Sequence, residues 1–454
     1  MLAVLRDRTY RRLFTAQVIA LAGTGLATVA LSLLAYDLAG GGASAVLGTA
    51  LAIKMVAYVG IAPVISAFAD RIPRRALLVG MDLTRAGVAL VLPFVDSVWQ
   101  VYVLIFLLQS ASAAFTPTFQ ATIPEVLPDE RDYTQALSLS RLAYDLESLF
   151  SPALAAGLLT LVTYNWLFAG TVVGFLASAA LVVSAVLPKP APVERTGGIY
   201  AKATFGTRLY WATPRLRALL ALDLVVAAAG AMVFVNTVVL VRDQLHRGAG
   251  DVSLALGAYG AGSMAAALML PKLLERLTDR AVMLPAAFTL VGVLGVFAAT
   301  PWSWPALLTA WALLGAATSA VLTPAGRLIR RSAAPADLPA AFAAQFSLSH
   351  GCWLLTYPLA GWLAAGAGMT TAAAVLTAIG LASAAVALFL WPSRDPVSLG
   401  HVHTGLPADD PHLADAHQHP NGWHHAHAYV IDVRHPRWPT SHRARRTPAS
   451  ALHG

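Results

Sequence analysis

Blocks of apolar residues long enough to cross a lipid bilayer recur along most of the chain, and they limit its possible folds more than any other feature. A membrane-spanning α-helix needs about 20 mostly apolar residues, because it must cross about 30 Å of hydrocarbon at about 1.5 Å per residue. Of the residues, 57% are hydrophobic and only 12% are charged, whereas soluble proteins carry about 25% charged residues. We therefore expect a polytopic membrane protein and not an enzyme. Transmembrane β-strands, about ten residues long with alternating polarity, do not fit these blocks.

The apolar windows fall into two groups of six with a polar linker between them. They lie at about 14–36, 45–68, 76–95, 98–120, 135–161 and 166–187, and then at about 216–240, 251–271, 281–299, 304–326, 340–365 and 371–391. We expect an all-α protein of twelve transmembrane helices in two pseudo-symmetric bundles. The expected domains are an N-terminal bundle (1–187), a linker (188–213), a C-terminal bundle (214–392) and a tail (393–454).

Lysine and arginine are shared unevenly between the loops on the two sides of the membrane. One side receives only Arg242 and Arg247. The other receives eighteen: Arg6, Arg8, Arg11, Arg12, Arg71, Arg74, Arg75, Arg131, Lys189, Arg195, Lys202, Arg208, Lys272, Arg276, Arg280, Arg327, Arg330 and Arg331. Since cytoplasmic loops retain positive charge, we expect both termini and the linker in the cytoplasm, with the protein in the bacterial plasma (inner) membrane. The net charge of +8 is then a topology signal, and we expect a monomer in the lipid bilayer without a nucleic-acid partner.

Short motifs of the first half recur in the second half at nearly constant spacing. The matches are 69–76 with 274–281, 116–117 with 323–324, 138–141 with 347–350, and Pro152 with Pro358. Parallel six-helix repeats are an architecture of transporters, in which the substrate site lies between the halves near the midplane.

The loop between the second and third spans carries the motif of a known family. Residues 66–75, Ser-Ala-Phe-Ala-Asp-Arg-Ile-Pro-Arg-Arg, match the pattern Gly-x-Leu-Ala-Asp-Arg-x-Gly-Arg-Lys, with Ser66 and Pro73 in place of the glycines. With this motif and the opening segment 6–25, residues 1–391 resemble the major facilitator superfamily and are similar to its drug and siderophore exporters. The resemblance implies alternating access between two six-helix halves.

The resemblance also implies a gating role for the charges of this loop. The expected gating residues are Asp70, Arg71, Arg74 and Arg75. The alternative is that these charges only mark the topology. Export coupled to protons is the default of such exporters, but the usual arginine of span four is absent, and only Gln109 remains of that motif.

Several ionisable residues lie inside the predicted spans, where each costs at least about 2.5–3.5 kcal/mol and is a functional candidate. Arg141 and Asp145 are four residues apart, so they share a helical face and can pair. The pair either lines the cavity or only holds the bundle together. Glu147 points elsewhere, and Asp223 has no partner readable from the sequence. His350 occupies the repeat position of Arg141 and is either a protonation switch or a structural histidine.

The tail has a different composition from the rest of the chain. Eleven of the thirteen histidines lie after Pro392, and histidine-rich tracts are typical of metal binding. Residues two apart in an extended chain point the same way, so His-x-His pairs can present two imidazoles to one ion. The predicted metal ligands are His401, His403, His417, His419, His424, His425 and His427. The alternative is a disordered tail that is merely soluble.

A histidine-rich tail on a twelve-span facilitator resembles the nickel-resistance exporters of the superfamily. We therefore expect a secondary transporter that exports a divalent transition metal, nickel first, in exchange for protons, with Ni²⁺ as substrate and tail ligand. Export of drugs, siderophores or other small organic molecules is the alternative, and it fits the apolar spans better. A membrane-anchored metal buffer or sensor without transport is the second alternative. The chain has no Walker A motif, so we expect no drive by ATP.

Overall fold

The structure is a computed structural model of the whole chain. It describes residues 2–39, 43–66, 72–188, 201, 203–393, 395, 398–404, 406–407, 410–432, 434–435 and 438–439. Asp70 and Arg71 of the expected gating loop lie outside these residues.

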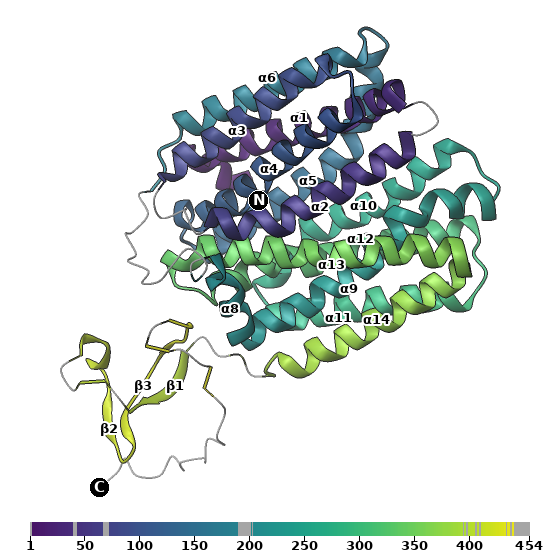
Figure 1. Cartoon of the computed structure of the whole chain (residues 1–454). Helices are drawn as coiled ribbons and strands as arrows, with labels where there is room; N and C mark the ends of the chain where they lie inside the picture. The colour runs from purple at the N-terminus through teal and green to yellow at the C-terminus, as the bar shows by residue number, and fades with distance from the viewer. Residues whose placement is uncertain are drawn as a thin grey trace.

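Twelve long helices form two groups of six in the described residues, which confirms the predicted fold class (Figure 1). The first group is α1 (Arg8–Ala39), α2 (Ala43–Ser66), α3 (Arg74–Val91), α4 (Val98–Val126), α5 (Glu130–Leu159) and α6 (Tyr164–Ser184). After the short α8 (Phe205–Ala212), the second group is α9 (Pro214–Val239), α10 (Ala249–Leu274), α11 (Asp279–Ala299), α12 (Trp304–Arg330), α13 (Leu338–Ala367) and α14 (Met369–Leu390).

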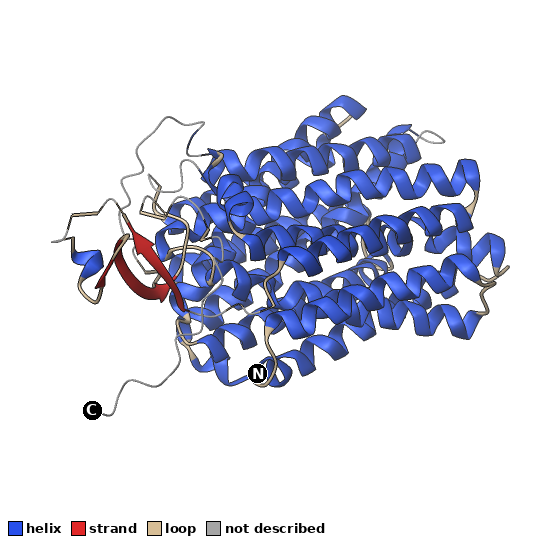
Figure 2. Ribbon diagram, turned by 90° about the horizontal axis from the view of Figure 1, so that it is seen from below, coloured by secondary structure: helices blue, strands red, loops and turns tan. Residues whose placement is uncertain are grey.

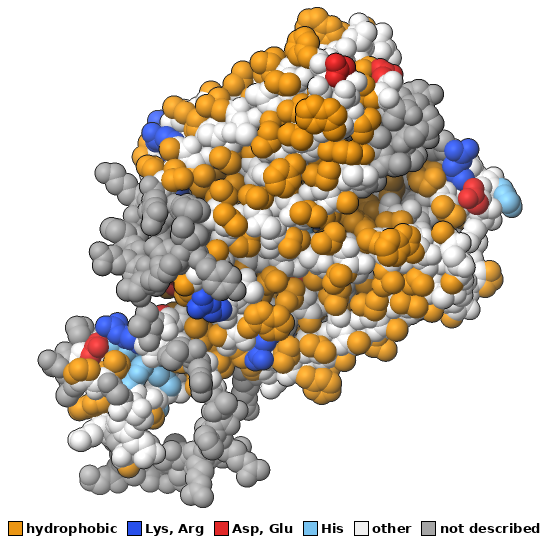
Figure 3. Space-filling model, viewed as in Figure 1, with side chains coloured by type: hydrophobic (Ala, Val, Ile, Leu, Met, Phe, Trp, Pro, Cys, Tyr) orange, Lys and Arg blue, Asp and Glu red, His pale blue; other side chains and the backbone are white. Residues whose placement is uncertain are grey.

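Nine of the described helices are long and apolar enough to cross a membrane. The three other long helices are α2, α5 and α13. Helix α5 contains the charged residues Arg141, Asp145 and Glu147, which lower its hydropathy although it lies inside the bundle. Hydrophobic side chains cover the visible face of the bundle between its two ends (Figure 3), as a lipid-facing surface requires.

Small residues allow close packing within the C-terminal half. A Cβ atom added at Gly262 of α10 would collide with the backbone carbonyl of Ala312 on α12. Gly315 of α12 lies equally close to the carbonyl of Tyr259 on α10. Such small-residue contacts are typical of helix pairs in membranes.

One end of the bundle carries the start of α1, the α4–α5, α10–α11 and α12–α13 loops, helix α8 of the linker and the strands of the tail (Figures 1 and 2). We call it the linker end. Helix α5 begins there because the Asp129 carboxylate caps it, accepting hydrogen bonds from the backbone N–H groups of Arg131 at 2.9 Å and Asp132 at 3.0 Å. Asp129 therefore fixes the position of Glu130, the first residue of α5.

The tail folds into a small antiparallel sheet beside the linker end (Figures 1 and 2). Its strands are β1 (Ser398–His403), β2 (His417–His419) and β3 (Gly422–Ala428), in the spatial order β1-β3-β2. The described part of the tail thus contains regular strands, which differs from the alternative of a disordered tail. The register places His401 opposite His425 and His417 opposite His424.

Candidate functional site

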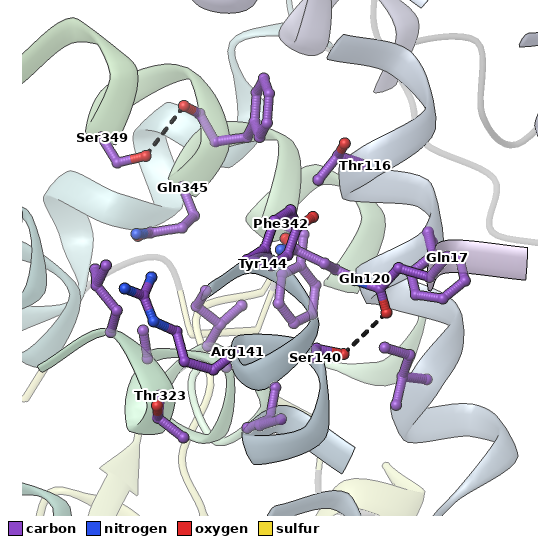
Figure 4. A pocket seen from close by; sticks show the side chains of 18 of the residues that line it. Gln17, Thr116, Gln120, Ser140, Arg141, Tyr144, Thr323, Phe342, Gln345 and Ser349 are labelled. Carbon is purple, nitrogen blue, oxygen red and sulfur yellow. Dashed lines mark hydrogen bonds between the residues drawn. The ribbon is translucent and has the colours of Figure 1, made fainter. Parts of the chain in front are cut away.

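A cavity of about 360 Å³ lies between the two halves (Figure 4). It is nearer the linker end, because its lining residues lie toward the ends of α4 and α12 and the starts of α5 and α13. Helices α1, α2, α4 and α5 supply one side, and α12 and α13 supply the other. The lining residues are Gln17, Tyr58, Thr116, Phe119, Gln120, Ile123, Leu137, Ser140, Arg141, Tyr144, Leu322, Thr323, Ala325, Gly326, Ile329, Phe342, Gln345, Phe346, Ser349 and His350.

The lining combines aromatic rings with amide and hydroxyl groups. None of the described lining residues is Asp or Glu, and Arg141 is the one Lys or Arg among them. Cavities of this kind, mostly apolar with a few placed polar groups, suit small organic molecules. A dication would meet Arg141 there and no carboxylate among the residues described.

Arg141 and Asp145 do pair, and the pair also contacts the other half of the protein. The Arg141 guanidinium lies 2.9 Å from the Asp145 carboxylate. The hydroxyl of Ser263 on α10 donates a hydrogen bond to Asp145 at 2.6 Å and accepts one from Arg141 at 3.0 Å. The cluster therefore connects α5 to α10 and joins the halves beside the cavity. Nothing in the sequence pointed to Ser263, because a lone serine in an apolar span carries no pattern.

His350 lines the cavity, and its ring packs among aromatic groups. Its ring centre lies 4.3 Å from that of Phe346 and 4.8 Å from that of Tyr58 on α2. Its Nδ1 atom lies 2.7 Å from the carbonyl of Phe346. His350 and Arg141, which are equivalent in the repeat, thus both border the cavity, one from each half.

The other two predicted residues do not line the cavity. Asp223 on α9 is 2% exposed, and the amide of Gln345 donates a hydrogen bond to its carboxyl group at 2.9 Å. Gln345 itself lines the cavity and accepts a hydrogen bond from Tyr210. Glu147 interacts electrostatically with Lys54 on α2, and it is not among the residues that line the cavity.

Ion pairs between the halves close the linker end below the cavity. Across the halves, Arg327 on α12 lies 2.6 Å from Glu130 on α5. Within the C-terminal half, Arg327 also lies 3.3 Å from Asp279 on α11, which supports the same guanidinium. Arg131 and Glu275 form a second pair at 2.9 Å, and Arg330 donates a hydrogen bond to the carbonyl of Pro128. We call the contacts of Arg327 with Glu130 and Asp279 the inter-half lock.

The described residues of the expected gating loop bind within the N-terminal half. Arg74 pairs with Glu125 at the end of α4, and Arg75 donates to the carbonyl of Ala185. These contacts attach the start of α3 to its neighbours in the same half. Among the described residues of the linker end, Pro128 of the α4–α5 loop and Glu130 and Arg131 of α5 contact the other half.

Six histidines of the tail lie together on one face of the sheet. They are His401, His403, His412, His425, His427 and His435. Burial, followed by the neighbouring imidazoles, lowers the pKa of His401 and of His425 to about 4. The imidazoles of these two residues are then neutral at ordinary pH. We call the six residues the histidine cluster.

Four of the seven predicted ligands belong to the histidine cluster, and the reason is strand alternation. His401, His403, His425 and His427 share one face of β1 and β3. His417 and His424 are exposed and lie on the opposite face, and the side chain of His419 lies outside the described residues.

His412 and His435 were not among the predicted ligands, because neither belongs to a His-x-His pair. Each lies in a turn that begins with an aspartate. The backbone N–H of His412 donates to the Asp410 carboxylate at 2.9 Å, and that of His435 donates to Asp432 at 2.7 Å. The Asp-x-His and Asp-x-x-His spacings were the signal that could have found them.

The family model of the major facilitator superfamily matches residues 13–241 and 220–411. The chain belongs to the major facilitator superfamily. This facilitator is therefore a multi-pass transporter of the lipid bilayer and not an enzyme, and the resemblance read from residues 66–75 is confirmed.

Two curated relatives match parts of this facilitator. Macrolide efflux protein A of Streptococcus pyogenes is 28% identical over 153 residues, which are 33% of this chain and 38% of that protein. The uncharacterized MFS-type transporter YfiS of Bacillus subtilis is 27% identical over 133 residues, which are 29% of this chain and 31% of that one. The matches thus span less than half the length of these relatives.

Solved structures share the fold at low sequence identity. The human organic anion transporter MFSD10 (TETRAN) superposes with a TM-score of 0.72 at 12% identity, covering 84% of this chain and 99% of the other. A bacterial homologue of the iron transporter ferroportin, in an outward-facing state, gives a TM-score of 0.69 at 14% identity with the same coverage. At this identity, both comparisons describe the fold alone.

Proposed function

We propose that this facilitator exports a small amphipathic organic molecule through the central cavity, by alternating access. The observation that carries the proposal is the cavity lining, in which aromatic rings and amides surround the space and no described carboxylate enters it. The relationship to a protein named for macrolide efflux supports the same substrate class. We place both termini on the cytoplasmic side of a bacterial inner membrane. This orientation rests on the distribution of basic residues, eighteen on one side and two on the other.

Protons are the proposed driving ion, and Asp223 is the proposed proton site. An intramembrane carboxyl group is a candidate member of a proton relay. Asp223 is buried, and its hydrogen-bond partner Gln345 faces the substrate space. Protonation of Asp223 would therefore change the hydrogen bonding of a residue that contacts the cargo.

A divalent metal, nickel first, is the second candidate cargo, and the histidine cluster is the observation that favours it. Against it, Asp145, Glu147 and Asp223 do not line the cavity, and His350 is the one imidazole among its described residues. On this second proposal the tail would collect the ion, and deletion of residues 393–454 would weaken metal tolerance without abolishing it.

Transport into inside-out proteoliposomes with an acidic lumen tests the proposal. We expect a radiolabelled macrolide or an amphipathic dye to accumulate, and a protonophore to abolish the accumulation. Accumulation of Ni²⁺ without either organic compound would overturn the proposal in favour of metal export. Stoichiometric metal binding that ignores the proton gradient, with no transport of any compound, would identify a buffer or sensor.

A further inference from the structure

The nitrogen atoms of the histidine cluster lie closer together than hydrogen bonding explains. The Nε2 atom of His401 is 3.0 Å from that of His403, 3.0 Å from that of His435 and 3.2 Å from that of His425. A ring nitrogen carries either one proton or one lone pair, so this atom can form one such bond and not three. The Nε2 atoms of His412 and His435 are also 3.2 Å apart.

These separations match the ligand spacing around one metal ion. Imidazole nitrogens bind late transition metals at about 2.0–2.1 Å, which separates neighbouring ligands by about 3.3 Å in a tetrahedron and about 3.0 Å in an octahedron. The ligand atoms of His401, His412, His425, His427 and His435 all lie within 4.8 Å of one another. Neutral imidazole donors favour Zn, Cu, Ni and related ions over Mg or Ca.

Surrounding oxygen atoms orient three of the rings for metal binding. The Nδ1 atom of His401 lies 3.1 Å from the carbonyl of Leu399, and that of His427 lies 2.8 Å from the carbonyl of Ala428. The Nδ1 atom of His435 lies 2.8 Å from the carboxylate of Asp432. Donation of the Nδ1 proton to these acceptors leaves the Nε2 lone pair free, as in metal-binding histidines.

Tyr429 connects the histidine cluster to the transmembrane helices. Its ring centre lies 4.9 Å from that of His401 and 4.7 Å from that of His435. Its carbonyl accepts a hydrogen bond at 3.4 Å from Arg215, at the start of α9. A second tail residue, Asp395, pairs with the same guanidinium at 3.1 Å.

From Arg215 the contacts continue to the inter-half lock. Arg215 donates to the carbonyl of Arg331 at 2.9 Å. The Arg331 guanidinium lies 3.4 Å from Asp279, which is a member of the lock. Contacts therefore run from the histidine cluster to the lock, first by ring packing onto Tyr429 and then by polar contacts through Arg215, Arg331 and Asp279.

We propose that the histidine cluster binds one divalent transition-metal ion and that the loaded tail holds the linker end of the transporter closed. A ligand favours the conformation in which its site is already formed. Here the imidazoles converge in a structure whose inter-half lock is made. The ion is thus a regulator of export, whatever molecule the cavity carries.

Metal binding is tested first, with the full-length protein in nanodiscs after chelator treatment. We expect one Zn²⁺ or Co²⁺ per chain, and a Co²⁺ visible spectrum that reports imidazole coordination. The double variant H401A/H425A should bind at least about 100-fold more weakly, because loss of a residue that only orients a ligand already costs about 10–100-fold. The matched control H417A/H424A removes two histidines from the opposite face of the same sheet and should bind like the wild type. Equal losses in both variants, or no loss in either, would overturn the site.

Coupling to the lock is tested by a distance between the halves. Spin labels at D132C and R276C, in a C352A background, lie on the α4–α5 and α10–α11 sides of the linker end. We expect one equivalent of diamagnetic Zn²⁺ to increase the short-distance population, and this response to disappear in H401A/H425A. The R215Q variant should still bind Zn²⁺ but show no response. An unchanged distance distribution in protein that has bound Zn²⁺ would overturn the coupling, independently of any transport assay.

Discussion

The central cavity and the histidine cluster differ in the side chains that form them. The cavity presents rings, amides and hydroxyls, and its Arg141 is neutralised by Asp145. The cluster gathers six imidazoles in a part of the chain that lies outside the bundle. Unpaired charge is expensive inside the hydrocarbon, whereas a domain in water can assemble many metal ligands at little cost. On the two proposals above, an organic cargo in the cavity and an ion in the tail would be recognised by separate parts of the chain.

The largest effect is expected from D145N, which removes the charge that pairs with the cavity residue Arg141. Removing one partner of a buried ion pair costs about 3–5 kcal/mol, and here the pair also binds Ser263 of the other half. If this cost is added to the barrier between the access states, initial transport rates fall about 10²–10⁴-fold. Rates in proteoliposomes measure it, with fluorescence of a tagged protein confirming membrane insertion.

The control for this variant is S263A, which removes one hydroxyl group and leaves the ion pair. It should cost about 0.5–1.5 kcal/mol, or about tenfold in rate at most. Normal transport by D145N would show that the pair serves only to hold the bundle together.

The second prediction concerns a substitution that distorts the sheet of the tail without changing a histidine. Gly422 has a φ of +133°, and a Cβ atom there would collide with the backbone carbonyl of His403. The strain of about 1–3 kcal/mol in G422A should displace His403 and weaken Zn²⁺ binding about tenfold, as measured by calorimetry. Export by the metal-free protein should not change.

G400A is the matched substitution in the same sheet. A Cβ atom at Gly400 would lie 3.1 Å from the end of the His424 side chain, which can move away on the other face. Its Zn²⁺ affinity should equal that of the wild type. If G422A slowed organic transport as much as it weakened metal binding, the proposed separation of the two sites would be wrong.

The third prediction concerns coupling in the cavity. Q345L removes the amide that donates to Asp223, and a buried polar group left without its partner costs about 1–3 kcal/mol. We expect the transport rate to fall about tenfold and to depend less on the pH gradient. Q120L changes another amide of the cavity lining, so it should alter substrate affinity and keep the dependence on the gradient. The same gradient dependence in both variants would remove Asp223 from the coupling path.

The sequence predicted the helices well because each span must satisfy the same length and polarity. It also predicted the pairing of Arg141 with Asp145, since spacing within one helix is a local property. It could not predict Ser263 or the separation of Asp223 from the cavity, because both depend on how helices distant in the chain pack together.

The tail shows the same division between local and non-local information. Strand alternation was predictable from His-x-His, and it holds for His401 with His403 and for His425 with His427. Which pairs share a face depends on the register in which the strands pair, which the sequence did not reveal. The expected ligand His417 therefore lies on the face away from the histidine cluster. His424 also lies there, because it is adjacent to His425 in β3.

The smallest effect is expected at the exposed ion pair of the linker end. Arg131 and Glu275 join the two halves at 2.9 Å, but their side chains are 71% and 47% exposed. Exposed pairs contribute about 0–1 kcal/mol and are screened by salt. E275Q should therefore change the closed population of the labelled protein by less than about fivefold, and the response to Zn²⁺ should persist.

R327Q provides the contrast at a less exposed position of the same end. Arg327 is 13% exposed and contacts Glu130, Asp279 and Thr134. Its loss should open the linker end and remove the Zn²⁺ response, because the contacts from the histidine cluster reach the other half through this side chain. Equal effects of E275Q and R327Q on the distance distribution would mean that the net charge of the linker end, and not a particular ion pair, sets the closed population. The tail would then control the gate through its overall charge and not through the path from Tyr429 to Arg327.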